Sequence, residues 1–174
     1  MYIEELYSMC EHIAFATIDR INDINARRGI SNPMLTGECN RAAIIFFLHF
    51  HHAFYERNLI SCLYDVKWYS NQIIMFNDTT RKITQNPFDV FGISCELVHG
   101  ELAHNPDKIP EEYWPVQHTI VEIEHHDNKI YVDITSRQFH EINKEIPDCY
   151  VGYRMPWWFY PDRDNPKFNK NLEL

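Results

Sequence analysis

Residues 118–135 constrain the fold most, because apolar and polar residues alternate on both sides of a short polar loop. The segments HTIVEIE (118–124) and KIYVDIT (129–135) flank the loop HHDN. Successive side chains of a strand point to opposite faces, so this alternation predicts an antiparallel hairpin. One face of the hairpin collects Thr119, Val121, Ile123, Ile130, Val132 and Ile134. That face needs an apolar cover.

A long apolar segment can supply the cover. Residues 39–57 read CNRAAIIFFLHFHHAFYER and are apolar nearly all round from Ala42 to Phe50. A helix that is apolar on every side is a buried one, and the segment is longer than an ordinary strand. We therefore predict a buried helix over 39–57, packed on the sheet.

The N-terminal part is predicted to be a second helix. Residues 2–28 carry apolar side chains at helical spacing, which is typical of an amphipathic helix. Arg27 and Arg28 suit the negative end of the helix dipole, and Gly29 is a natural stop. The segment 30–38, ISNPMLTGE, contains Pro and Gly and is predicted to be a loop.

The other segments complete a mixed architecture. Residues 59–99 hold short β-branched and aromatic stretches that predict strands, and 100–112 predict a polar loop. The aromatic and proline-rich residues 147–174 predict a tail that wraps irregularly over the body. At 174 residues and 45% hydrophobic content, the chain is predicted to form a single domain over 1–174. The predicted fold class is α+β.

Charge and cysteine count limit the partners and the compartment. A net charge of −9 argues against nucleic-acid binding, which needs a basic surface, and permits a basic protein partner. The five cysteines are an odd number with no CxxC pair, so neither a disulfide scaffold nor a zinc knuckle is expected. No stretch reaches the roughly 18 apolar residues of a membrane span. These features predict a protein of the reducing cytoplasm with no membrane partner, and leave open delivery into another cell.

One face of the hairpin brings an imidazole near a carboxylate. If Glu124 pairs with Lys129, His118 lies opposite Thr135 and Asp133 is its diagonal neighbour. A carboxylate that accepts from one ring nitrogen fixes the tautomer of the imidazole. The sequence therefore predicts an oriented histidine.

Cys39 is the candidate for this histidine to activate. It opens the buried helix, where the positive end of the dipole lowers the pKa of a thiol and unpaired N–H groups can hold an oxyanion. Glu38 would oppose ionisation of the thiol if its side chain pointed inward. Asn32 or Gln117 could lend a further oxyanion donor, and Gln138 either lies near the site or caps the strand.

The order of these elements resembles the transglutaminase-like branch of the papain-like thiol enzymes. There a Cys opens a buried helix, and a strand that often reads H-x-W-V-E precedes one that ends in D-x-T; here HTIVEI and YVDIT match. The run DITSRQF also resembles bacterial papain-fold toxins and protein deamidases. The resemblance covers roughly residues 35–140 and implies a papain-like core. It implies Cys39 as nucleophile, His118 as general base and acid, and Asp133 as orienting residue.

The chemistry so implied is thiol acyl transfer on an amide of a protein substrate, which needs no cofactor. Deamidation of glutamine or a related amide hydrolysis is the first interpretation, by resemblance. Proteolysis, transglutamination and acetyl transfer stay open, as does an inactive acidic binding or inhibitor protein with the same fold. The cluster His49, His51 and His52 lacks partners at zinc-like spacing apart from Glu56, so no metal site is predicted.

Overall fold

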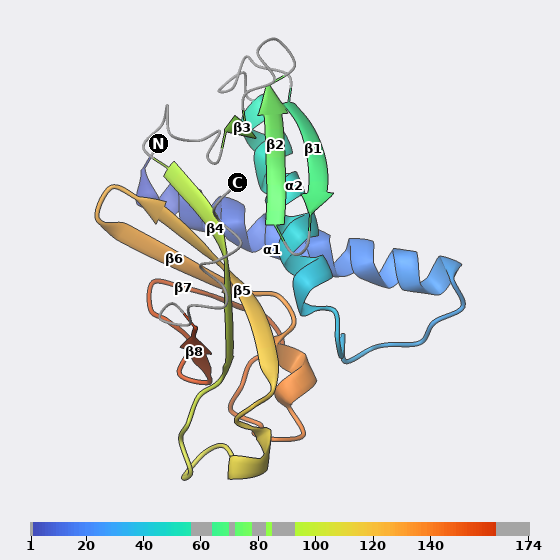
Figure 1. Ribbon diagram of the computed structural model, residues 1–174, viewed down its shortest axis with the longest axis vertical. Helices are drawn as coiled ribbons and strands as arrows, with labels where there is room; N and C mark the ends of the chain where they lie inside the picture. Colours follow the sequence, from blue (N-terminus) through green and yellow to red (C-terminus); the bar gives the residue numbers. More distant parts are fainter. Residues whose placement is uncertain (1, 57–63, 70–71, 78–82, 85–92, 163–174) are drawn as a thin grey trace.

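The computed structural model describes residues 2–56, 64–69, 72–77, 83–84 and 93–162 (Figure 1). Two helices and a curled, antiparallel five-stranded sheet make a mixed α+β fold. Within the described residues, neither helix is long and apolar enough to cross a bilayer.

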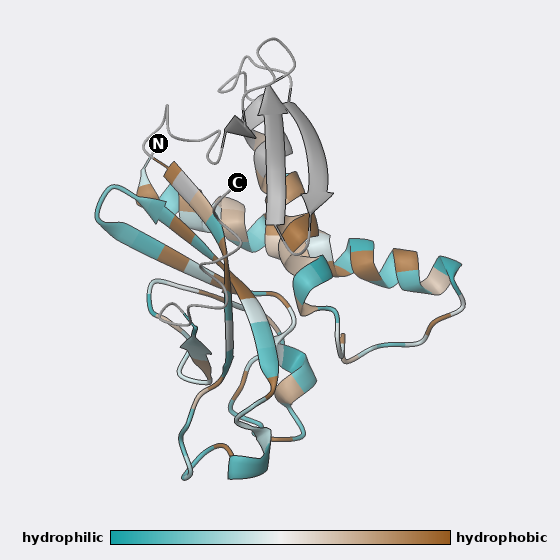
Figure 2. Ribbon diagram, in the orientation of Figure 1, coloured by the Kyte–Doolittle hydropathy of each residue, from teal (hydrophilic) through white to brown (hydrophobic). Residues whose placement is uncertain are grey.

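The two helices lie where the spacing predicts them. Helix α1 (Ile3–Arg27) is capped by Tyr2, whose backbone N–H donates to the Glu5 carboxylate at 3.0 Å. It ends before Gly29, which has φ +68° and donates its N–H to the carbonyl of Ala26. Both apolar and polar residues occur along the length of α1, as expected for an amphipathic helix (Figure 2). After the loop, α2 (Cys39–Glu56) packs on both α1 and the sheet.

The main sheet has the strand order β7-β6-β5-β4-β8, with every neighbouring pair antiparallel. Its strands are β4 (Ile93–Leu102), β5 (Gln117–His125), β6 (Asn128–Asp133), β7 (Tyr150–Gly152) and β8 (Phe159–Pro161). The central hairpin pairs Glu124 with Lys129, which confirms the predicted register. Pairing continues to His125 and Asn128, so the turn is shorter than predicted.

Strands are also found in the segment predicted to contain them. There β1 (Tyr64–Tyr69), β2 (Gln72–Asn77) and β3 (Ile83–Thr84) form a separate antiparallel sheet. The parts of that prediction at 59–63, 70–71, 78–82 and 85–92 lie outside the described residues.

The prediction of a polar loop from residue 100 is wrong at its start. Strand β4 continues to Leu102, because Gly100 and Glu101 pair with His118 and Gln117 of β5. Strand β8 pairs with the same end of β4 from its other side. Two flanking partners therefore hold this polar stretch extended. The short 3₁₀ helix η2 (Glu111–Tyr113) follows.

The sheet is covered on both faces. One face packs against α1 and α2 through the hairpin residues that the alternation assigns to it, among them Val121, Ile123, Ile130 and Val132. The opposite face forms a second apolar cluster of Val98, Leu102, Ile109, Ile120, Tyr131, Phe139, Ile146, Trp158 and Phe159.

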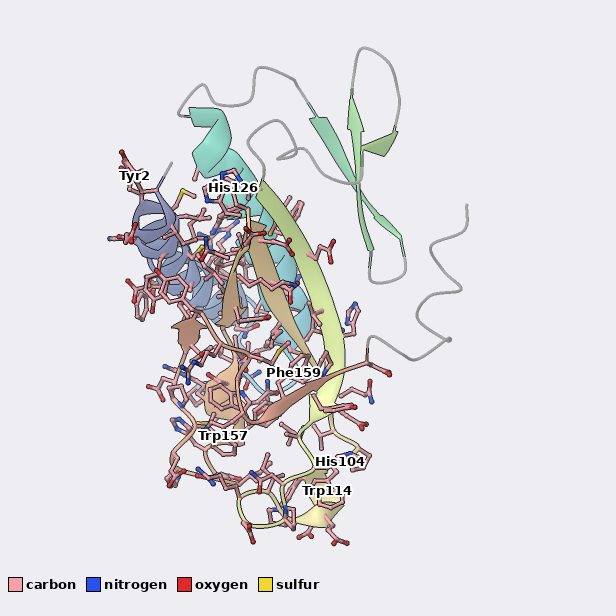
Figure 3. All side chains as sticks on the ribbon, turned by 90° about the vertical axis from the view of Figure 1, so that its left-hand side faces the viewer. Tyr2, His104, Trp114, His126, Trp157 and Phe159 are labelled. Carbon is pink, nitrogen blue, oxygen red and sulfur yellow. The ribbon has the colours of Figure 1, made fainter. Side chains whose placement is uncertain are left out.

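The C-terminal tail supplies part of this second cluster. Trp157, Phe159, His104 and Trp114 lie toward the end of the sheet that is remote from Tyr2 and His126 (Figure 3). The described part of the tail, residues 147–162, is more regular than predicted, because it contributes an edge strand on each side of the sheet. Residues 163–174 of the predicted tail lie outside the described residues.

Candidate functional site

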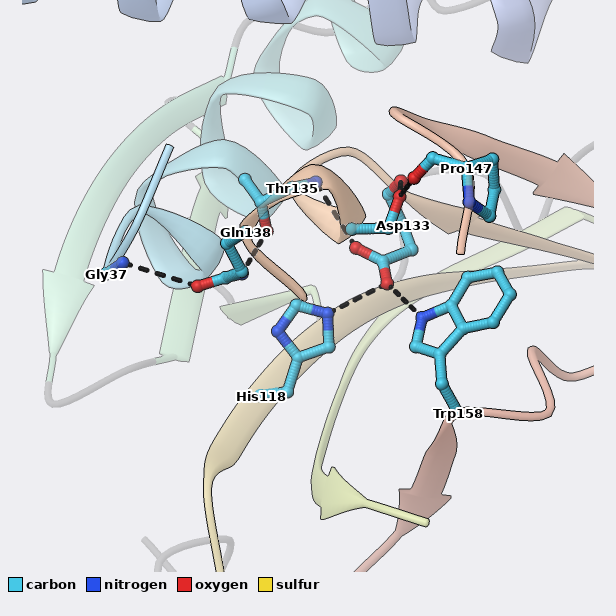
Figure 4. A network of polar contacts seen from close by, with 8 residues as sticks. Gly37, His118, Asp133, Thr135, Gln138, Pro147 and Trp158 are labelled. Atoms are coloured by element: carbon cyan, nitrogen blue, oxygen red, sulfur yellow. Dashed lines mark hydrogen bonds and ion pairs between the residues drawn. The ribbon is translucent and has the colours of Figure 1, made fainter. Parts of the chain in front are cut away.

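Asp133 is the buried anion of the site. It is the last residue of β6, and its side chain is fully buried. Its Oδ2 accepts from Nε2 of His118 at 2.9 Å and from Nε1 of Trp158 at 2.8 Å, and its Oδ1 accepts from the backbone N–H of Thr135 at 3.2 Å (Figure 4). A buried charge is costly unless it is paired and hydrogen-bonded. Three donors satisfy this carboxylate and fix its orientation.

His118 occupies the second position of β5 and is buried between aromatic side chains. Its ring meets Phe139 edge to face at a centroid distance of 4.8 Å, and Phe159 at 6.0 Å. Gly100 lies opposite His118 on β4 and leaves room for this packing. A Cβ at Gly100 would overlap the carbonyl oxygen of Tyr160 and lie 2.7 Å from the ring of Phe159. The ring of Phe159 can therefore reach His118 because residue 100 has no side chain.

The carboxylate makes the imidazole basic. Burial by itself would lower the pKa of His118, but the charge of Asp133 and its hydrogen bond act in the opposite direction, with a smaller contribution from Cys39. Together they raise the pKa of His118 to about 9. The imidazolium form is therefore favoured at neutral pH.

Cys39 opens α2 and interacts with the same imidazole. Burial would raise the pKa of its thiol, but the proximity and the charge of the His118 ring lower it. Contacts of the sulfur with the backbone of Thr119 and Asn40 add to the lowering. The net result is a pKa of Cys39 below the ordinary thiol value. Together with the raised pKa of His118, this favours a thiolate–imidazolium pair.

Cys39 and His118 influence each other's pKa without a well-formed hydrogen bond between them. Nδ1 of His118 makes no hydrogen bond of good geometry within the described residues, although the ring and the thiol shift each other's pKa. Both pKa shifts have the same physical origin, the proximity of the two groups. In substrate-free sites such bonds are often long and tighten when substrate binds.

Glu38 precedes Cys39 but is engaged elsewhere. Its carboxylate accepts from Nδ2 of Asn25 at 3.3 Å, and its Oε2 lies 3.0 Å from the guanidinium of Arg41. The positive charge of Arg41 offsets the negative charge next to the thiol. Glu38 is therefore paired with Arg41 and Asn25 and is not an isolated charge beside the thiol.

The three candidate amide residues have different places. Gln138 donates to Oγ1 of Thr135 at 3.0 Å and accepts from the N–H of Gly37 at 3.4 Å, so it links the loop before Cys39 to the chain after Asp133 (Figure 4). Asn32 uses both arms of its amide on the backbone of Thr36, which closes the loop.

Gln117 is exposed at the first position of β5, next to His118. Of the three candidates, only Gln138 makes a hydrogen bond that connects the surroundings of Cys39 with those of Asp133.

Two sets of contacts at the site were not predicted from the sequence. The indole of Trp158 comes from the tail, and no periodicity indicates that it reaches Asp133. The second is a chain of contacts in which Oγ1 of Thr119 donates to Oδ1 of Asn40 at 2.6 Å and lies 2.8 Å from Nδ1 of His99. The alternation of the hairpin does carry a signal for Thr119, because it places this residue on the helix-covered face.

The imidazole of His118 interacts with the thiol of Cys39 on one side and with the carboxylate of Asp133 on the other. This arrangement is suited to nucleophilic catalysis. Among the residues that the structure describes, no three His, Cys, Asp or Glu side chains come together as metal ligands. No model of a known protein family matches the chain, and no similar protein was found among curated proteins or solved structures.

Proposed function

We propose that the chain is a thiol acyl-transfer enzyme that acts on an amide of a protein substrate. One observation supports this most: a single buried imidazole interacts with the thiol of Cys39 and holds the carboxylate of Asp133 through Nε2. The pKa of Cys39 is lowered and that of His118 is raised, which are the directions expected for an activated nucleophile and its proton donor.

The proposed reaction uses these groups in two steps. The thiolate of Cys39 attacks the carbonyl carbon of the amide, and the imidazolium of His118 gives its proton to the departing nitrogen as the C–N bond breaks. Water then attacks the thioester, with His118 as base, and releases the carboxylic acid and the thiol. With a side-chain carboxamide as substrate, the products are a carboxylate and ammonia. Deamidation of glutamine is our first choice among these reactions, and it rests on the resemblance to papain-like deamidases.

The acidic character of the chain supports a partner with a basic surface. A net charge of −9 gives a field that attracts basic proteins and repels nucleic acid. The proposed substrate is therefore a basic-surfaced protein that presents an accessible carboxamide.

Selective alkylation tests the proposal. Iodoacetamide at pH 7, followed by peptide mapping, should modify Cys39 much faster than Cys10, Cys95 or Cys149, because burial raises the pKa of each of these three thiols. Cys62 lies outside the described residues, and the comparison does not use it. Labelling of Cys39 that is as slow as that of Cys10 would contradict the proposal and favour a binding protein without turnover.

A further inference from the structure

We propose that the side-chain amide of Asn40 is an oxyanion donor of this site, held in place by Thr119 and His99. This inference rests on the proposed function, because it assigns a role in the attack by Cys39. It goes beyond the oxyanion candidates Asn32, Gln117 and Gln138 that the sequence suggests.

Asn40 is fixed beside the nucleophile. It is the second residue of α2, directly after Cys39, and the backbone of Asn40 and of Thr119 lies against the sulfur of Cys39. The oxyanion oxygen of the tetrahedral intermediate is two bonds from this sulfur, so it would lie close to the first turn of α2. The side chain of Asn40 is half-buried, so part of it remains open to solvent.

A polar chain fixes the amide of Asn40. The hydroxyl of Thr119 donates to Oδ1 of Asn40 at 2.6 Å. A hydroxyl has one proton, so with that proton given to Asn40 the 2.8 Å contact with His99 requires a donor on Nδ1 of His99. His99 therefore donates to Thr119, and Thr119 donates to Asn40. The amide oxygen is occupied and the plane of the amide is set.

The nitrogen of this amide remains as a donor. Nδ2 of Asn40 makes no hydrogen bond within the described residues, whereas the amide arms of Asn32 and Gln138 are engaged by backbone and hydroxyl groups of the neighbouring loops. Amide N–H groups held in advance are the donors that stabilise a tetrahedral intermediate, since they need no reorganisation during the reaction. The oriented oxygen of Asn40 thus leaves a preorganised nitrogen for the substrate carbonyl.

Two reagents separate oxyanion stabilisation from activation of the thiol. With p-nitrophenyl acetate, the sulfur of Cys39 attacks the carbonyl carbon, the electron pair moves to oxygen, and collapse of this oxyanion expels p-nitrophenolate to leave an acetyl thioester. With iodoacetamide, the sulfur displaces iodide and no oxyanion forms. A donor to the oxyanion therefore accelerates the first reaction only.

The expected result for Asn40→Ala is a loss of about 10²- to 10³-fold in the rate of acylation of Cys39. The rate of alkylation should change by less than about threefold, since the thiol and its partner His118 remain. Asn40→Asp keeps an oxygen for Thr119 but lacks the N–H donors. It should show a similar loss in the rate of acylation when the two proteins are compared at pH values where the same fraction of Cys39 is ionised. Asn22→Ala, an exposed asparagine of α1, is the matched control and should change neither rate.

The positioning role is tested by Thr119→Val. This variant should slow acylation less than Asn40→Ala does, and the double variant should be no slower than Asn40→Ala alone, because both act through the same amide. Equal losses in acylation and alkylation, or no loss in acylation, would overturn the inference about Asn40. A different result would contradict the proposed function itself: alkylation of Cys39 in the unaltered protein that is no faster than alkylation of the buried thiols.

Discussion

Trp158 and His118 donate to the same oxygen of Asp133, at 2.8 and 2.9 Å. The indole comes from the tail just before β8, and the imidazole from β5, so the carboxylate joins two segments that are distant in the sequence. The indole N–H restrains Oδ2 without competing for the proton of the imidazole. Trp158 thereby helps to set the direction in which Asp133 holds the imidazole.

Replacing Trp158 with Phe should affect both stability and reactivity. The variant keeps most of the buried ring surface but removes one donor to a buried carboxylate, which typically costs about 1–3 kcal/mol. Urea denaturation should show this loss, and alkylation of Cys39 should slow because the imidazole is less firmly oriented. Trp157→Phe is the matched control: that ring is half-buried, with Nζ of Lys108 4.5 Å from its centroid, and Phe retains this contact. Equal effects of the two variants would contradict the role assigned to Trp158.

The pH dependence of alkylation should report the pairing of Cys39 with His118. In the unaltered protein the rate should remain high below pH 8, because His118 lowers the pKa of Cys39. In His118→Gln the side chain can still reach Asp133 but carries no charge, so the midpoint of the profile should move upward toward the value of an ordinary thiol. Rates measured from pH 5 to 10 give both midpoints. Superimposable profiles would show that the imidazole does not activate the thiol.

The protonated His118 should also stabilise the fold in a defined pH range. Its pKa is raised from 6.5 to about 9 in the folded protein, so the stabilisation is complete below pH 6.5 and is lost as the pH rises through about 9. At roughly 1.4 kcal/mol per pH unit, the shift corresponds to about 3 kcal/mol.

Urea denaturation from pH 6 to 10 can measure the part of this stabilisation that is due to Asp133 in a Cys39→Ser background, where the thiol neither titrates nor contributes to the raised pKa. The free energy of unfolding should fall with rising pH relative to the same protein carrying His118→Gln. A difference between the two proteins that stays constant over this range would contradict the raised pKa.

The local parts of the fold could be predicted because each has a periodic signal. The alternation around the hairpin determines the register that pairs Glu124 with Lys129, since a shift of one residue would exchange the two faces. Helix α1 and the start of α2 at Cys39 follow from helical spacing and from the Pro- and Gly-containing loop between them. The proximity of His118 and Asp133 follows from the same register.

The non-local parts of the site could not be predicted. Strand β8 pairs with β4 across a separation of nearly 60 residues, and its few residues carry no alternation that could reveal the partner. The direction of the Glu38 side chain depends on Asn25 of α1 as well as on Arg41 in the first turn of α2. The contact of Trp158 with Asp133 depends on how the tail packs on the sheet, and the contact of Asn40 with Thr119 depends on how α2 packs on β5.

Gly100 should not tolerate a side chain. In Gly100→Ala the new Cβ would overlap the carbonyl oxygen of Tyr160 and the ring of Phe159, so β8 must move away from β4. We expect a loss of about 1–3 kcal/mol in the free energy of unfolding, together with slower alkylation of Cys39. Adding Phe159→Leu should not restore either quantity, because the backbone of Tyr160 still blocks the Cβ. Restoration by Phe159→Leu would show that the ring alone requires glycine here.

The ion pair between Glu38 and Arg41 should protect the ionised thiol of Cys39. In Arg41→Met the length of the side chain is kept, but the buried carboxylate of Glu38 loses its cation and its negative charge acts on the thiolate. We expect alkylation at pH 6 to slow by about two- to fivefold, a modest effect because solvent screens the half-exposed guanidinium. Glu38→Gln in the same protein removes the uncompensated charge and should restore the rate. If Arg41→Met has no effect while Glu38→Gln alone accelerates alkylation, the carboxylate acts on the thiol directly and Arg41 does not offset it.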